Sequence, residues 1–243
     1  MPNCVREVIA SAKKLSRDVS KLEFAAPVTH VYNPLKYAWA AHEQYLQRIN
    51  PKGVRVLLLG MNPGPWGMAQ TGVPFGQIAA VRDWLKIDAK IGRPLDEHPK
   101  RPVTGLSCQR SEVSGKRLWG LFQQRFKSAK HFFAGHFVVN YCPLVFMEEG
   151  GRNRTPDKLP AAEREPLDEV CDQHLRQLCR TPEPEWAVGV GAFAEKCLQR
   201  VLSDSTMKIT RILHPSPASP AANRGWAEAA TRQMIDAGVW NDE

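Results

Sequence analysis

The 243-residue chain contains no long apolar run, no paired cysteine spacing and no internal repeat. No segment approaches the length of a membrane-spanning helix, and the N-terminus lacks the apolar core of a signal peptide. The six cysteines show no CxxC spacing, so we expect free thiols, no metal site and no cofactor. These absences predict a soluble, intracellular protein that does not contact a membrane.

Two glycine-rich signatures of phosphate binding are also missing. The spacings GxxxxGK[ST] and GxGxxG do not occur, which disfavours an enzyme of nucleoside triphosphates. What the sequence does have is positive charge, because 33 Lys and Arg residues outnumber 25 Asp and Glu residues and leave a net charge of +8. This excess favours a polyanionic partner such as nucleic acid, although charge alone is a non-specific cue.

Four short runs of nearly continuous apolar residues predict buried strands, at residues 54–59, 136–139, 186–190 and 208–213. Continuous hydrophobicity is typical of a parallel sheet that is covered on both faces. Helical patterns lie before, between and after these runs, at residues 37–50, 77–85, 115–126, 161–178, 192–202 and 221–237. The alternation predicts an α/β fold, a three-layer α/β/α arrangement with a central, mainly parallel, four-stranded sheet.

The rest of the chain is assigned to the same domain. Residues 1–25 are polar and basic with apolar positions at helical spacing, which predicts an amphipathic helix packed on the domain edge. Residues 90–115, rich in Pro, Gly and Arg, are interpreted as a surface excursion, and residues 150–156 as a loop. We therefore expect residues 1–243 to form a single domain.

Three predicted strands end in loops of unusual composition. These loops are GMNPGPWGM at residues 60–68, NYCPL at 140–144 and HPSP at 214–217. Ligands of an open parallel sheet bind beyond the carboxyl ends of its strands. We therefore expect the three loops to meet at one rim and to form the site, whereas the remaining strand ends in small residues at 189–191.

Each loop has a functional and a structural interpretation. Glycines let a backbone approach a ligand and prolines make its path rigid, but a plain tight turn has the same composition. The amide of Asn140 donates and accepts together and so can read an imide edge, whereas a capping role is the alternative. His214 follows a strand directly and is held by two prolines, which favours a catalytic role, although a lone histidine is more often structural.

Together these segments resemble one known family. The run GMNPGPWGMAQTGVPFG at residues 60–76 is similar to the first motif of the single-strand-selective monofunctional uracil-DNA glycosylases, and this motif is highly specific. NYCPL resembles their base-reading segment, and HPSP resembles the second motif of the wider uracil-glycosylase superfamily. The likeness extends in family order from about residue 25 to 238. It includes further similarity at residues 111–115 and 151–153.

The resemblance implies the uracil-glycosylase fold and a role for each matching residue. Asn62 and His214 would be catalytic: Asn62 would position the attacking water, and His214 would stabilise negative charge on uracil O2. Asn140 would read the uracil edge, and Phe75 would stack on the flipped base. The pocket near uracil C5 would be lined by Met61, Gly64 and Met68.

The residue types agree with this chemistry. Departing uracil leaves an oxocarbenium-like sugar and a uracil anion, so preorganised donors at O2 are required. Cytosine presents the reversed pattern to Asn140, at a cost of about 1–3 kcal/mol for each buried group left unpaired. We expect a monofunctional glycosylase that hydrolyses the N-glycosidic bond of uracil, and of some deaminated or 5-modified bases, in base excision repair.

The expected partner is uracil-containing DNA, single- or double-stranded. The base must be extruded, which is easiest in single strands or mismatches. Residues 217–226, PASPAANRGW, resemble the family's wedge, but Ala218 and Ser219 stand where relatives often have Arg-Asn, which favours single strands. The expected DNA contacts are Pro215, Ser216, Pro217, Ala218, Ser219, Asn223 and Arg224. We expect a monomer, cytoplasmic in a bacterium or nuclear in a eukaryote.

Two alternatives stay open at this point. A broader glycosylase would also remove xanthine or hypoxanthine, which requires more room beside Phe75 and a different hydrogen-bond match at Asn140. A damage-binding protein that has lost catalysis is the other alternative. The presence of both Asn62 and His214 argues against it, because a degenerate site would be expected to lose one of them.

Overall fold

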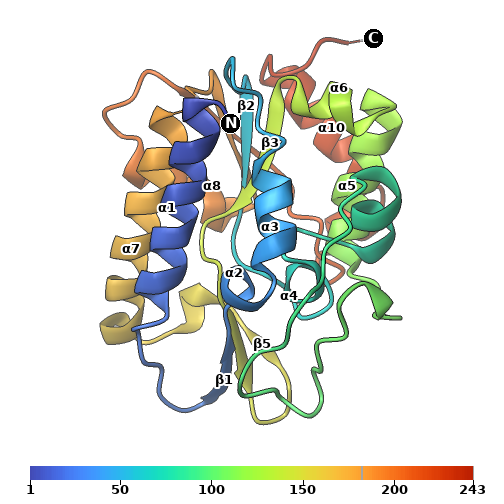
Figure 1. Ribbon diagram of the computed structural model, residues 1–243. Helices are drawn as coiled ribbons and strands as arrows, with labels where there is room; N and C mark the ends of the chain where they lie inside the picture. Colours follow the sequence, from blue (N-terminus) through green and yellow to red (C-terminus); the bar gives the residue numbers. More distant parts are fainter. Residues whose placement is uncertain (182, 243) are drawn as a thin grey trace.

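The computed structural model describes residues 1–181 and 183–242. Its centre is a four-stranded parallel sheet in the order β3-β2-β6-β7 (Figure 1). The strands are β2 (Val56–Gly60), β3 (His136–Asn140), β6 (Trp186–Val190) and β7 (Lys208–Ile212). All four predicted strands are confirmed, and the prediction of continuous burial holds for β2, β3 and β6. The edge strand β7 is largely accessible and buries only Ile212.

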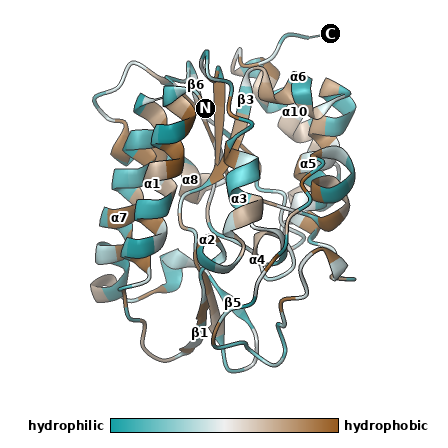
Figure 2. Ribbon diagram, viewed as in Figure 1, coloured by the Kyte–Doolittle hydropathy of each residue, from teal (hydrophilic) through white to brown (hydrophobic). Residues whose placement is uncertain are grey.

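Helices cover the two faces of this sheet, so the predicted three-layer α/β/α arrangement is confirmed. One side carries α1 (Asn3–Val19), α7 (Ala161–Arg180) and α8 (Ala192–Val201). The other side carries α5 (Val113–Phe126), α6 (Ala129–Phe133) and α10 (Trp226–Asp236). Figure 2 shows apolar strands between helices whose polar residues face outward, which is the pattern that buries a core between layers.

Several predicted helices are shorter or broken. The helix predicted at 37–50 is divided into α2 (Pro34–Tyr37) and α3 (Trp39–Leu46), and that at 77–85 contains a π-helical turn, Ala80–Trp84. The last predicted helix is divided into α9 (Pro220–Asn223) and α10. Gly225 separates these two with φ of +142°, a conformation that side-chain-bearing residues rarely adopt.

A second, antiparallel sheet was not predicted. It contains β1 (Val28–Tyr32), β4 (Val145–Glu148) and β5 (Asn153–Arg154) in the order β1-β4-β5, at the bottom of Figure 1. The prediction of a plain loop at 150–156 is therefore wrong at Asn153–Arg154. Residues 90–112 form the predicted excursion, which is interrupted by a 3₁₀ turn at Gly105–Ser107. A second 3₁₀ turn, Pro156–Lys158, follows β5. Helix α4 (Met68–Thr71) lies in the segment after β2.

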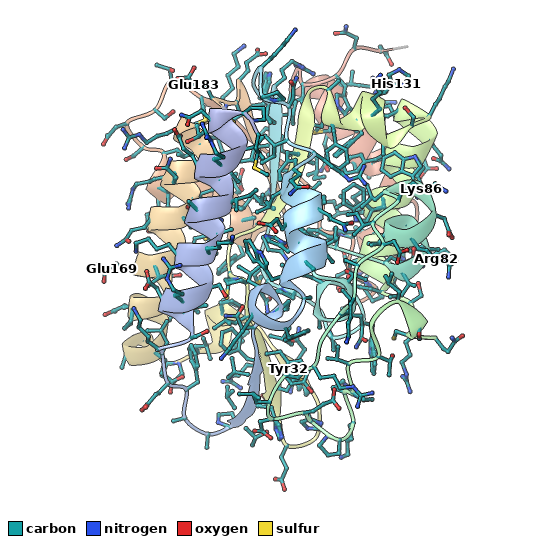
Figure 3. All side chains as sticks on the ribbon, in the orientation of Figure 1. Tyr32, Arg82, Lys86, His131, Glu169 and Glu183 are labelled. Carbon is teal, nitrogen blue, oxygen red and sulfur yellow. The ribbon has the colours of Figure 1, made fainter. Side chains whose placement is uncertain are left out.

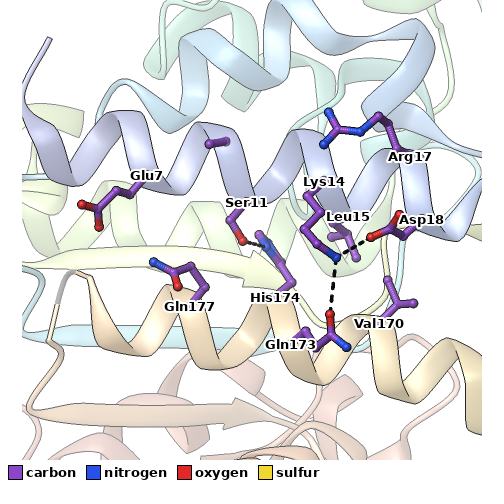
Figure 4. Close-up of a pocket in the computed structure, with 11 residues that line it drawn as sticks. Glu7, Ser11, Lys14, Leu15, Arg17, Asp18, Val170, Gln173, His174 and Gln177 are labelled. Atoms are coloured by element: carbon purple, nitrogen blue, oxygen red, sulfur yellow. Dashed lines mark hydrogen bonds and ion pairs between the residues drawn. The ribbon is translucent and has the colours of Figure 1, made fainter.

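At the N-terminus, where a helix was expected over residues 1–25, the structure has α1, which ends at Val19 and lies along α7 (Figure 4). Its apolar face enters the main hydrophobic core, and its polar face is tied to α7. Ser11 Oγ and His174 Nδ1 are 2.7 Å apart, while Lys14 Nζ donates to Asp18 at 2.6 Å and to Gln173 at 3.4 Å. The cavity of about 520 Å³ between these helices is lined by these polar groups together with the apolar side chains of Ala10, Leu15 and Val170.

Charged side chains occupy the outer surface. Arg82 and Lys86 are exposed in and just after the π-helical turn, and Glu169 is exposed on α7 (Figure 3). Among the helices that the structure describes, none combines the length and apolar character needed to cross a bilayer.

Candidate active site

The loops after β2, β3 and β7 meet at one rim, as the sequence predicts. Strand β2 lies beside β3 with Gly60 opposite Asn140. The pairing continues beyond the strands, because Tyr141 N donates to Gly60 O at 2.9 Å and Cys142 N donates to Met61 O at 2.9 Å. These bonds hold the first two loops together at the carboxyl end of the sheet.

The three loops enclose a cavity of about 350 Å³. Its lining is Met61, Asn62, Pro63, Gly64, Phe75, Glu112, Ser114, Asn140, Asn153, Thr155, His214 and Ser216. Most of the residues expected at the substrate are therefore brought together. The exception is Met68, which is buried behind Asn140 rather than in the lining.

Four lining residues outside the three loops were given no role from the sequence: Glu112, Ser114, Asn153 and Thr155. The available signal was the similarity at 111–115 and 151–153, which includes Glu112, Ser114 and Asn153 but not Thr155. Nothing in those segments indicates that they reach the rim, because that depends on where α5 begins and on the unpredicted strand β5.

The amide of Asn62 is oriented by the second loop. Its Nδ2 donates to the carbonyl oxygen of Leu144 at 3.1 Å and, at a longer 3.4 Å, to that of Pro63. With the amide hydrogens directed to the protein, Oδ1 is the atom of Asn62 left to accept a hydrogen bond in the cavity. An acceptor at this point suits the alignment of a water molecule.

Phe75 and Asn140 approach each other across Gly60. A Cβ atom on Gly60 would collide with the Phe75 ring and with Oδ1 of Asn140, so a glycine is required there. Phe75 itself has φ of +53°, an unusual conformation for a bulky residue that is often found at functional sites. Gln77 N donates to Phe75 O at 2.7 Å and helps to hold this backbone conformation.

The Asn140 amide is buried but incompletely bonded. Its Oδ1 has no hydrogen-bond partner among the residues described, and its Nδ2 donates to the sulfur of Met68 at 3.3 Å. A thioether is a weak acceptor. Buried polar groups normally have good partners, so this amide has both a donor and an acceptor available for a ligand.

His214 stands opposite, at the end of β7. Burial lowers its pKa, so the imidazole is neutral at neutral pH and still carries one N–H donor. The ring centroids of His214 and Phe75 are 6.3 Å apart. Gly191 makes room for the histidine, because a Cβ atom there would lie 3.0 Å from His214 Cβ. The small residues after β6 therefore have a steric function that the sequence did not reveal.

Arg117 of α5 clamps the third loop. Its Nη1 donates to the carbonyl oxygens of Pro215 at 3.1 Å and Ser216 at 3.2 Å, and its Nη2 donates to Asn223 Oδ1 at 2.8 Å. Pro215 is buried and directs the loop, whereas Ala218 and Arg224 are exposed beyond it. Of the seven expected DNA contacts, the exposed ones are Pro217, Ala218, Asn223 and Arg224.

Positive charge also lies beside Trp66 in the first loop. The guanidinium groups of Arg101 and Arg110 stand 5.3 Å and 4.8 Å from the centroid of this ring. Both distances suit cation–π contacts.

Comparisons of sequence with known proteins identify one family, and a comparison of structure shows a shared fold. Residues 46–235 match the model of the uracil DNA glycosylase superfamily. A single-strand selective monofunctional uracil-DNA glycosylase of Rattus norvegicus is 46% identical over 228 residues, which cover 93% of this chain and 82% of that protein. The protein of that name from Bos taurus is 45% identical, with 93% and 84% covered. The crystal structure of Pedobacter heparinus SMUG2 shares the fold, with a TM-score of 0.63 at 18% identity and 96% and 99% of the chains covered.

Proposed function

This chain belongs to the uracil DNA glycosylase superfamily and, within it, to the single-strand selective monofunctional uracil-DNA glycosylases, and we propose on this basis that it excises uracil from DNA. It hydrolyses the bond between uracil N1 and deoxyribose C1′ and leaves an abasic site for base excision repair. The observation that carries this proposal is the incompletely bonded amide of Asn140 in a cavity shared with Asn62 and His214.

Uracil is recognised at the inner end of the cavity. Asn140 Oδ1 accepts the N3–H group of the base, and Nδ2 exchanges its weak bond to the Met68 sulfur for a stronger one to O4. Phe75 stacks on the ring, and Met61 and Gly64 border its C5 side. A cytosine would place a donor against the amide hydrogens and is rejected, because both groups would remain unpaired.

Bond cleavage uses groups on opposite walls. Asn62 Oδ1 accepts one hydrogen bond from a water molecule and directs its oxygen toward C1′. As the C1′–N1 bond breaks, its electron pair passes to the base and negative charge collects on O2. The neutral His214 donates its N–H to that oxygen, which stabilises the leaving group where the charge develops.

The DNA contacts follow from the loop that Arg117 holds. Residues 215–224 lie beside the cavity and act as the wedge next to the flipped nucleotide, with Arg101, Arg110 and Arg224 near the phosphates. The enzyme accepts single- and double-stranded DNA and favours single strands, because Ala218 and Ser219 offer little to insert into a duplex. We expect it to act as a monomer, and the main core extending from Val5 to Trp240 supports a single domain.

The test is alkaline cleavage of a labelled oligonucleotide that carries one uracil. The wild-type protein should generate an alkali-sensitive site, and Asn62→Ala and His214→Ala should each abolish most of this activity. Binding of the oligonucleotide without an abasic product would contradict the proposal. Parallel substrates with xanthine, hypoxanthine or a 5-modified uracil, single-stranded and paired, define the base range. A flat salt response of binding would contradict the phosphate contacts.

A further inference from the structure

Glu112 brings a carboxyl group into the cavity. It immediately precedes the first residue of α5, and its side chain reaches the wall formed by the first loop. Among the described residues that line the cavity, Glu112 and His214 are the two with ionisable side chains. The sequence pattern had assigned no chemistry to Glu112.

The first loop is shaped around this carboxyl group. A Cβ atom on Gly64 would collide with Oε1 of Glu112, and one on Gly67 would collide with Oε2. The two glycines thus open a slot for the side chain. Although the residue as a whole is partly exposed, Oε2 is buried and has no hydrogen-bond partner among the described residues. A buried, unpaired carboxyl group is costly and is rarely retained for packing alone.

We propose that Glu112 is a catalytic residue that accepts the proton of the attacking water. The water oxygen forms the new bond to C1′ while the C1′–N1 bond breaks and its electron pair leaves with uracil. One water proton passes to the Glu112 carboxylate and the other stays on the new hydroxyl group. The carboxylate later releases its proton to solvent, and uracil leaves as the anion bound by His214. This inference rests on the proposed function.

The division of roles follows from the chemistry of the cavity. The Asn62 amide aligns a water molecule but cannot take its proton at neutral pH, and the imidazole N–H is directed to the departing base. Burial raises the pKa of Glu112 to about 7, so near neutral pH a large fraction is ionised and remains basic enough to accept a proton. Two ionisable groups in different surroundings then serve as base and hydrogen-bond donor.

The first experiment compares wild type with Glu112→Gln, which keeps the shape and removes the charge. Single-turnover excision of uracil from a single-stranded oligonucleotide should slow by about 10²-fold or more. Binding to an oligonucleotide with non-cleavable 2′-fluoro-2′-deoxyuridine should stay within about threefold of wild type. A variant that keeps the wild-type excision rate, or that loses binding in proportion to rate, contradicts the inference.

The second experiment is the pH profile, which a merely structural role would not alter. The wild-type rate should rise with pH through about 7 as Glu112 ionises. This rise should vanish in Glu112→Gln and persist in Glu112→Asp and in the slow His214→Ala. Its persistence in Glu112→Gln, or its absence from wild type, overturns the inference. A wild type inactive on uracil contradicts instead the proposed function itself.

Discussion

Asn140 and Tyr141 are consecutive and both buried, yet their polar groups lie in opposite surroundings. Tyr141 belongs to a network in which every charged group has a partner. Its hydroxyl donates to Asp172 at 2.6 Å and accepts from Arg200 at 2.8 Å, and Arg200 also bridges to Asp172 at 2.7 Å. On the other side of the same loop, Asn140 Oδ1 and Glu112 Oε2 have no partner among the residues described.

This difference distinguishes polar groups that hold the structure together from polar groups that are available to a ligand, although the two residues are adjacent in the chain. A saturated network fixes α7 and α8 against the loop and has nothing left to offer a ligand. Unpaired acceptors at the cavity lower the stability of the empty protein, and in the proposed function they become the partners of the bound base and water. Exchanging or deleting groups on either side tests this interpretation.

The largest effect is expected on the catalytic side, at His214. Removing one preorganised donor to a developing anion typically lowers kcat by about 10²–10³-fold. His214→Ala should show such a loss in single-turnover assays with its melting temperature nearly unchanged. A large fall in melting temperature at full activity would instead assign His214 to the structural side of the comparison.

The two buried carboxyl groups should respond oppositely to neutralisation. The pKa of Glu112 rises from 4.5 to about 7 on folding. The ionisation of Glu112 therefore favours the unfolded chain increasingly as the pH rises from 4.5 to about 7. Glu112→Gln should therefore stabilise the protein at mildly alkaline pH by about 3 kcal/mol at most.

In contrast, Asp172→Asn breaks the pair with Arg200 and should destabilise the protein. The two variants are compared by melting curves recorded from pH 4.5 through about 7 and into the mildly alkaline range. If both variants were destabilised equally, the unpaired carboxyl group of Glu112 and the paired one of Asp172 would not differ in their effect on stability.

Asn140→Ala should reduce activity without loosening the fold. The lost hydrogen bonds to the base lower kcat/KM for uracil by about 10²-fold, at roughly 1–1.5 kcal/mol each. Chemical denaturation should give a free energy of unfolding close to that of wild type, because among the described residues the amide bonds only to the Met68 sulfur. A marked loss of stability would indicate that Asn140 braces the loop after all.

The smallest effect is expected from the matched substitution at the next residue, Tyr141. Tyr141→Phe removes the hydroxyl between Asp172 and Arg200 and should lower the free energy of unfolding by about 1.5–2 kcal/mol. Excision of uracil should continue at nearly the wild-type rate, measured beside Asn140→Ala. Loss of activity without loss of stability would place Tyr141 in the site and undo the comparison.

The main sheet could be predicted because its strands are continuous apolar runs, a signal that depends on local composition. The longer helices that cover it were found by periodicity, whereas the short helix α6 (Ala129–Phe133) was not predicted. The resemblance supplied roles for Asn62, Asn140 and His214. The small sheet was not predicted, because β5 contains only Asn153 and Arg154 and forms through its pairing with β4. Two polar residues carry no pattern that indicates a strand.

The sequence by itself determined the α/β class, the three loops at the ends of strands and the amide and imidazole at their starts. These depend on composition, periodicity and motif order, which are properties of neighbouring residues. Only the tertiary structure decided that Glu112 enters the cavity, that Gly191 makes room for His214 and that Arg117 holds the third loop. The reason is that burial, steric clearance and missing partners arise between residues far apart in the chain.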